Sequence, residues 1–330
     1  MDRALDGPRL KPDPVGFLNY QHESRIVSDF RFRKDELFRL FRVLRIPRKV
    51  RTPSGCVYNG LYAMLVMLRR LGTAGTVNDF MHTFGIGEAR VSELFNHMIK
   101  QTIRRWGHLL TDCRPFRPHF KKYARAIRRS GATVKRCVGF VDGNDLPIAK
   151  PSKFERYTFS GKSRMHLLKH QGFVSPNGMI MHFFGPCAGS ITDSTMLGKS
   201  RLQRQMRSVC GAPGERHHYF IYGDPAYAMT DYIMTPCGHG DISRRQNRFN
   251  INMARKRIAV EWAFGKMQEE WPFFCVKKEQ KIFSAPVSNR YKVAALLTNF
   301  RTCLYGSNAS RYFGVPTPSL ESYVRGNPDA

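Results

Sequence analysis

The sequence predicts an α+β protein in which a mixed sheet flanked by helices follows an N-terminal all-helical domain. Three observations indicate this class. Residues 30–110 carry apolar side chains at helical spacing, residues 136–184 carry apolar runs of strand length, and residues 252–271 form one long helical pattern. With 330 residues and 42% apolar content, the chain can form one large domain or two modest ones.

The charge balance predicts a polyanionic partner. Lys and Arg number 54 against 25 Asp and Glu, so the formal net charge is +29. An excess of this size favours nucleic acid over a membrane surface, and no apolar run of about 18 residues is available to cross a bilayer. The eight cysteines include no C-x-x-C pair, which is typical of reduced thiols inside a cell.

The composition along the chain predicts a division into four segments. Residues 1–29 are predicted to be a flexible arm, 30–110 a helical domain, 111–305 the catalytic domain and 306–330 a flexible tail. The helical domain is expected to contain helices over residues 30–46, 59–71, 77–84 and 88–110.

The turn at Gly85-Ile86-Gly87, between a short and a longer helix, is typical of a helix-turn-helix. On that interpretation Arg90 and Ser92, at the start of the longer helix, face a DNA major groove. The alternative is a helical bundle that only packs on the next domain.

Residues 115–136, just before the first strand of the catalytic domain, are strongly basic. A charge run is usually a solvated face, but here it flanks an acidic site where a polyanionic substrate has to be held. We therefore predict contact with the DNA backbone for Lys121, Lys122, Arg125, Arg128 and Arg129.

The strand predicted over residues 136–142 is the centre of the catalytic domain. It is expected to end at Asp142, with a turn at Gly143-Asn144. The remaining elements are expected as strands over 157–162, 165–174, 179–184 and 219–223, a hairpin turn over 175–178, and helices over 195–208, 252–271 and 289–305.

Three acids stand out in this order of elements, which is the ribonuclease-H-like arrangement. Asp142 and Asp224 each end a buried strand, and Glu261 lies in the middle of a helix. Such a set can hold two divalent cations, Mg²⁺ or Mn²⁺, for phosphoryl transfer. Arg257, one turn before Glu261, is expected to orient that carboxylate or contact a phosphate. Each acid taken alone has a structural alternative: a turn cap, a loop charge or a surface helix acid.

Six motifs, in order, resemble those of the PIF/Harbinger transposases, which are DDE enzymes with an RNase H-like catalytic domain. They are VDGN at 141–144, YTFSGKSRMH at 157–166, GSITDSTML at 189–197, YGDPAY at 222–227, RIAVEWAFGKM at 257–267 and ALLTNF at 295–300. The resemblance implies that Asp142, Asp224 and Glu261 are the catalytic and metal-binding acids. Lys162 and Asp193 match further motif positions and are possible auxiliary residues; the alternative for Asp193 is a helix N-cap.

Two positions depart from the family pattern. Members often have a His shortly before the acid that matches Asp193, and many have His at the position of Thr298. Neither position belongs to the acid triad, so the departures concern secondary contacts.

The resemblance implies a metal-dependent endonuclease that cuts double-stranded DNA at terminal inverted repeats and joins it at A/T-rich targets. It also implies a homo-oligomer, a nuclear location and a Myb-like accessory protein. Two alternatives share much of this chemistry. One is a domesticated DNA-binding protein that no longer cuts, and the other is a nuclease of RNA–DNA hybrids or junctions.

Overall fold

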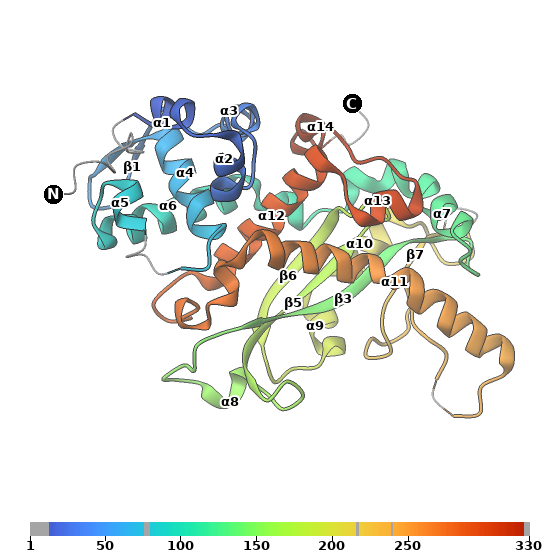
Figure 1. The fold of residues 1–330 in the computed structure, drawn as a ribbon. Helices are drawn as coiled ribbons and strands as arrows, with labels where there is room; N and C mark the ends of the chain where they lie inside the picture. Colours follow the sequence, from blue (N-terminus) through green and yellow to red (C-terminus); the bar gives the residue numbers. More distant parts are fainter. Residues whose placement is uncertain (1–12, 76–79, 216–217, 239, 327–330) are drawn as a thin grey trace. The chain divides into compact units, whose positions relative to one another are not determined.

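The computed structural model describes residues 13–75, 80–215, 218–238 and 240–326, which pack as two compact units (Figure 1). The first unit contains the described residues up to Arg105 together with Gln268–Ala294. The second contains Trp106–Met267 and the described residues from Ala295 onward. The segment Gln268–Ala294 therefore belongs to the first unit. The predicted division of the chain near residue 110 assigned this segment to the second domain.

Helix α4 (Gly60–Leu71) is the core of the first unit. Its sequence is apolar almost throughout, and Asn59 caps it by accepting a hydrogen bond from the Leu61 N–H at 2.8 Å. Arg70 is buried in its last turn, where it pairs with Glu279 at 2.7 Å and lies over the Phe273 ring at 4.6 Å. These contacts explain why residues 268–294 pack with this unit.

The other elements of the first unit are short. They are α1 (Pro14–Tyr20), α2 (Glu23–Phe30), α3 (Lys34–Val43), β1 (Lys49–Arg51), β2 (Val57–Asn59), α5 (Met81–Phe84), α6 (Glu88–Trp106), the 3-10 turns η4 (Pro272–Cys275) and η5 (Lys277–Glu279), and the start of α12 (Val287–Tyr305).

The structure corrects two predictions for this unit. Residues 1–29 are not a flexible arm in their described part, because α1 and α2 form there, with Asp13 capping α1 and with Leu18 and Ile26 buried. The unit is also not all-helical, because β1 and β2 pair antiparallel. Both features escaped the sequence analysis because their apolar runs are shorter than the windows that reveal a period.

Helices α5 and α6 are separated by a turn, as the helix-turn-helix pattern predicts, although residues 76–79 lie outside the described residues. Arg90 is exposed and Ser92 half-buried on the first turns of α6. Glu93 accepts hydrogen bonds from the Ser54 backbone N–H at 2.8 Å and from its hydroxyl at 2.7 Å. This part of α6 therefore carries an internal contact, and DNA contact by Arg90 and Ser92 stays a prediction.

The second unit is built on one mixed sheet. Its elements are the 3-10 turns η2 (Gly107–Leu110) and η3 (Arg114–His119), α7 (Phe120–Arg129), β3 (Cys137–Pro147), α8 (Glu155–Thr158), β4 (Phe159–Ser160), β5 (Met165–Val174), β6 (Ile180–Ala188), α9 (Asp193–Lys199), α10 (Leu202–Val209), β7 (Phe220–Tyr222), β8 (Ile233–Met234), α11 (Arg244–Glu270), the end of α12, α13 (Asn308–Phe313) and α14 (Leu320–Val324).

The strand order is β6-β5-β3-β7-β8, and β4 pairs with the first residues of β5. Strand β5 pairs antiparallel with both β3 and β6, whereas β7 runs parallel to β3 and β8 parallel to β7. Figure 1 shows α11 crossing beside β3, β5 and β6. A mixed sheet of this order flanked by helices is consistent with the predicted RNase H-like fold.

Strand β3 is longer than predicted. Asp142 does not end it, and Gly143-Asn144 is not a turn, because Gly143 and Asn144 stay paired with Gln171 and His170 of β5. The Gly-Asn signal is local, and the long partner strand overrides it here. The predicted turn at 175–178 does form: the Ser175 N–H donates to the Met179 carbonyl at 3.0 Å.

The structure also corrects two helical predictions and the predicted flexible tail. The helix expected over 195–208 is split into α9 and α10 at Arg201, which has a left-handed φ of 57°. Helix α11 begins at Arg244, inside a stretch expected to be loop. The tail over 306–330 is not flexible in its described part, because α13 and α14 form there and the Phe313 ring stacks on Phe140 of β3 with centroids 6.0 Å apart.

Among the described residues, no helix combines the length and the apolar content needed to cross a bilayer.

His182 of β6 lies in the core of the second unit, with 2% of its surface exposed. Burial disfavours the imidazolium and lowers the pKa of His182 to about 4, although a hydrogen bond with the Ser200 backbone opposes the shift. The unfolded chain therefore takes up this proton near pH 6.5, before the native protein does, so the free energy of unfolding falls as the pH drops from about 6.5 to about 4.

We expect His182→Leu to remove about 3 kcal/mol of this pH-dependent loss, since the folded and unfolded pKa values differ by about 2.5 pH units. Urea unfolding at a series of pH values measures it. An identical pH dependence in the wild type and the variant would show that His182 is not the titrating group.

Candidate functional site

Strand β3 places Asp142 at the centre of the sheet. The carboxylate is 19% exposed and accepts a hydrogen bond from the Gly143 N–H at 2.8 Å. Burial raises the pKa of Asp142 to about 6; Arg257 opposes the rise, and the nearby charges of Asp224 and Glu261 add to it. The three predicted catalytic acids therefore lie in one electrostatic neighbourhood.

Asp224 comes two residues after β7, the strand that runs parallel to β3. The ends of neighbouring parallel strands lie on the same edge of a sheet, so this topology brings Asp224 toward Asp142. Asp224 also accepts a hydrogen bond from the Ala226 N–H at 3.0 Å, which holds its side chain over the following turn.

Helix α11 supplies Glu261 and Arg257, one turn apart. The Arg257 guanidinium donates to Asp142 Oδ2 and also contacts Glu261 Oε1 at 3.0 Å. It therefore joins the acid on the sheet to the acid on the helix. The sequence analysis expected Arg257 to orient Glu261, and the structure adds the contact with Asp142.

A glycine lets α11 approach the sheet this closely. Gly172 of β5 is the register partner of Asp142, and a Cβ at this position would lie 2.6 Å from Cζ of Phe264. Phe264 lies one turn after Glu261 and packs edge-to-face on Phe183 of β6. The absence of a side chain at Gly172 therefore leaves space for the Phe264 ring. Because of this space, α11 can lie close to the strand that pairs with β3.

Asp193 and Lys162 were predicted as auxiliary residues. Asp193 is not the N-cap of α9, because Thr192 fills that role and accepts from the Thr195 N–H at 3.2 Å. Instead Asp193 Oδ1 lies 3.4 Å from the Lys169 ammonium on β5. Lys162 is exposed, and its charge lowers the pKa of Asp145, although burial of that carboxyl raises it overall.

Tyr227 was missed as a site residue, although the YGDPAY motif contains it. Its side chain is buried, and the Gln171 amide donates to its oxygen at 3.3 Å. Burial raises the pKa of Tyr227 well above its ordinary range, and the charges of Asp142, Asp193 and Asp224 act in the same direction. A neutral hydroxyl group therefore lies among three acids, where it can donate a hydrogen bond but does not ionise.

The acid set fits a divalent cation in its chemistry. Carboxylate oxygens are the ligands that Mg²⁺ prefers, and the Arg257 guanidinium shows that this position already accommodates a positive charge between two of the acids. In the described part of the chain, no three His, Cys, Asp or Glu side chains are grouped so that they could hold a metal ion.

A second polar feature of this unit is the basic face of α7. Lys121, Lys122, Arg125 and Arg129 line a pocket of about 350 Å³ that is completed by residues 313–315. They are exposed, as is Arg128, and among the described residues no carboxylate pairs with any of these five cations. The structure thus gathers four of the five cations predicted to contact the DNA backbone around one hollow.

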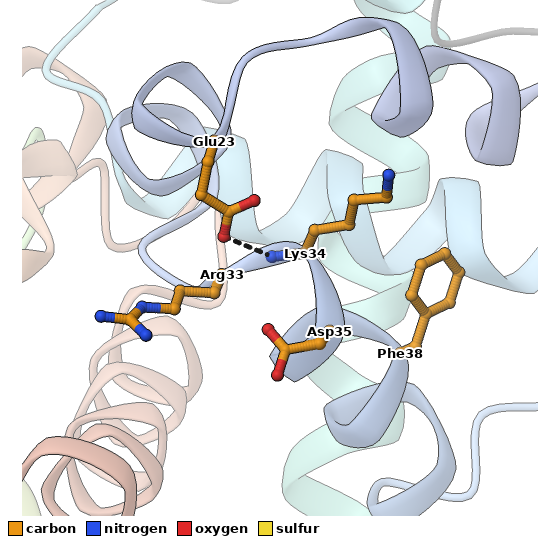
Figure 2. Close-up of a pocket in the computed structure, with 5 residues that line it drawn as sticks. All are labelled: Glu23, Arg33, Lys34, Asp35 and Phe38. Carbon is orange, nitrogen blue, oxygen red and sulfur yellow. Dashed lines mark hydrogen bonds between the residues drawn. The ribbon is translucent and has the colours of Figure 1, made fainter.

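The first unit has a hollow of its own at the start of α3. Figure 2 shows it lined by two acids, two cations and one ring, with Glu23 accepting a hydrogen bond from the Lys34 N–H at 3.0 Å. Because Glu23 and Asp35 balance Arg33 and Lys34, this hollow has no preference for a charged ligand. It therefore adds no candidate site.

Comparison with known proteins finds similarity in the segment that carries the three acids. Residues 141–299 match the family described as DDE superfamily endonuclease, and this segment contains Asp142, Asp224 and Glu261. The chain is also similar to "Protein ALP1-like" of Arabidopsis thaliana, with 22% identity over 216 residues, which cover 62% of this chain and 51% of that protein. The match thus spans about half the length of that curated relative. No solved structure is significantly similar. Residues 141–299 are thus similar to DDE endonuclease domains, a superfamily that generally uses divalent metal ions.

We expect Gly172→Ala to lower the free energy of unfolding by about 1–3 kcal/mol, because the new methyl group meets the Phe264 ring and forces α11 away from the sheet. Urea unfolding measures the change. Combining it with Phe264→Leu should recover part of the loss, since the two residues are in contact.

Gly265→Ala is the matched control. Nothing lies within 4 Å of a Cβ at Gly265, so alanine should stabilise the helix by roughly 0.5–1 kcal/mol. Equal destabilisation by both alanines would contradict the close approach of α11 at Gly172.

Proposed function

We propose that this chain is a DDE-type endonuclease and strand transferase that acts on double-stranded DNA. The observation that carries the proposal is the convergence of Asp142, Asp224 and Glu261, from two strands and a helix, in a protein with a net charge of +29. The similarity of residues 141–299 to DDE endonucleases supports it. Terminal inverted repeats as the substrate, A/T-rich targets, a Myb-like partner, assembly as a homo-oligomer and a nuclear location belong to the same proposal.

In this proposal the three acids hold two divalent ions, Mg²⁺ or Mn²⁺. Bound there, the ions supply the positive charge that activates an attacking oxygen and stabilises the leaving one. Asp142 and Asp224 provide ligands from adjacent strands, which keeps them rigid, and Glu261 provides the third from α11. Arg257, once released from Asp142, lies one turn from Glu261 and can donate to a phosphate oxygen.

The basic face of α7 is the proposed contact with the DNA backbone. The cations lie on one side of an amphipathic helix whose other side is buried against β3. Guanidinium and ammonium groups without acidic partners can bind DNA phosphates and displace the cations condensed on the DNA. The release of these cations favours binding and makes the affinity depend on the salt concentration.

The same fold also supports a second function, a DNA-binding protein that does not cut. The contact of Arg257 with both Asp142 and Glu261 favours it, since this arginine already neutralises two of the acids that a metal ion would bind. A protein that kept this contact permanently would retain the basic surface without the chemistry.

Incubation with a supercoiled plasmid and Mn²⁺ tests the cutting function. Wild type should nick the plasmid, and Asp142→Asn, Asp224→Asn and Glu261→Gln should each lower the rate on the order of a hundredfold or more, because each removes a charged ligand. Glu269→Gln, an exposed acid near the end of the same helix, is the matched control and should leave the rate unchanged. Equal nicking by wild type and Asp142→Asn would remove this site from the reaction.

The midpoint of thermal unfolding with and without Mn²⁺ separates the two functions. Stabilisation of the wild type by the metal, lost in Asp142→Asn, supports the endonuclease. Stabilisation seen only in Arg257→Gln, with no nicking by the wild type, supports the protein that does not cut. Arg255→Gln, an exposed arginine on the same helix, is the control.

The α7 proposal predicts a change in salt dependence. Lys121→Gln combined with Arg125→Gln should reduce the slope of log affinity against log salt by roughly 1 to 2, since each lost phosphate contact removes about one unit. Fluorescence anisotropy with a labelled duplex measures it. Arg207→Gln, an exposed arginine of α10, should leave the slope unchanged, and an equal effect there would mean that only net charge matters.

A further inference from the structure

Residues 148–164 form an arm between β3 and β5 that carries three exposed aromatic side chains. Phe154 is 64% exposed, Tyr157 63% and Phe159 42%. Rings of this size are usually buried, so three of them within six residues on one surface segment indicate a partner. Figure 1 shows this segment, with α8, projecting beyond the strands of the sheet.

The arm is also strongly basic. It contains five cations and one carboxylate, Glu155, which pairs with Lys150 at 3.0 Å. The other four cations are exposed, and no described carboxylate forms an ion pair with them: Lys153, Arg156, Lys162 and Arg164. Cations and rings are therefore interspersed along the arm. Proteins that bind unpaired nucleotides show the same combination, in which rings stack on bases and cations contact phosphates.

The arm is held in a defined shape. The Thr158 hydroxyl donates to the Glu155 carbonyl at 3.0 Å and also bonds to His166 Nδ1 at 3.0 Å, while the Ser190 N–H donates to the Tyr157 carbonyl at 3.1 Å. Phe154 has a left-handed φ of 58°, a conformation that bulky residues rarely adopt. The rings are thus presented on a fixed backbone, which reduces the entropy lost when a ligand binds.

The end of the arm contacts the strand that carries Asp142. The Ser163 hydroxyl donates to Asp145 at 3.4 Å, and Asp145 lies three residues after Asp142 on β3. Phe159 lies farther along the sheet, because it pairs with His166 of β5, six residues from Gly172, the register partner of Asp142. Six residues of strand span about 20 Å, which corresponds to roughly six stacked nucleotides. A strand whose phosphate reaches Asp142 can therefore place bases about six nucleotides away on the arm.

We infer that the arm binds unpaired nucleotides of a strand that also reaches the acid site, by stacking their bases on Tyr157 and Phe159. Duplex DNA offers no free base faces to these rings, so the ligand is DNA with a single-stranded gap or a frayed end. The inference rests on the proposed function for the nature of the ligand, but it needs no cutting. It assigns the preference for unpaired DNA to the arm and the general affinity for duplex to α7.

Fluorescence anisotropy of the full chain in EDTA tests this with a labelled duplex and the same duplex carrying a single-stranded gap. Wild type should bind the gapped DNA roughly tenfold more tightly than the duplex. Tyr157→Ala with Phe159→Ala should abolish that preference and leave duplex affinity within about twofold, whereas Tyr157→Phe should retain it because the ring remains. Tyr20→Ala, which removes a 67% exposed ring from the first unit, is the matched control.

A fluorescent adenine analogue in the gap gives a direct readout. Stacking should quench it on binding to wild type but not to the double variant. Equal losses on both DNAs overturn the inference and leave the proposed DNA function intact, whereas no binding to either DNA overturns both. If the double variant instead changes only the oligomeric state in sedimentation, the rings form a contact between copies of the chain, and the inference is wrong.

Discussion

The contact of Arg257 with Asp142 and Glu261 is the interaction on which the candidate site depends. Asp142 lies in the middle of a sheet, where water cannot fully solvate it, and two more acids add their charges. Without a nearby cation, this cluster favours either protonation or separation of the acids. The guanidinium allows three carboxylates to remain together, and a divalent ion could replace it for the same electrostatic reason.

This contact requires helix α11 to lie at a fixed distance from the sheet. Two sets of contacts keep it at that distance. Near the acids, Gly172 leaves room for Phe264. Five residues before Glu261, the buried ammonium of Lys256 bonds to the Ser130 carbonyl, just after the end of α7, and to the Tyr312 hydroxyl of α13 at 2.7 Å. The helix that carries Glu261 is thereby joined to the helix that carries the basic face.

The cations of the chain therefore have two different roles. Some cations are internal, such as Arg70 and Arg257, and compensate buried or clustered acids. Others, on α7 and on the arm over 148–164, are exposed and meet no described acid. The first kind stabilises the fold, and only the second is available to phosphates, so net charge alone does not indicate where a nucleic acid binds.

Much of the second unit could be predicted from local patterns. The apolar run of β3, the Asn-Gly turn after β5 and the stripe of α11 are each encoded within about 20 residues, which is the range that periodicity reports. Because Asp142, Asp224 and Glu261 belong to such elements, their identity as a set followed from the sequence and from its motifs. The contact of Arg257 with Asp142 joins residues 115 positions apart, and the helices in residues 14–30 and 308–324 form because tertiary packing buries them.

By itself, the sequence determined which residues carry charge, which segments are apolar and which acids follow strands, because these properties are local. Only the tertiary structure decided that β3 continues past Asp142, that α11 approaches at Gly172 and that an arginine lies between the acids. The reason is physical: pairing, close approach and charge compensation depend on distances between elements, and a periodic pattern along the chain contains no such distances.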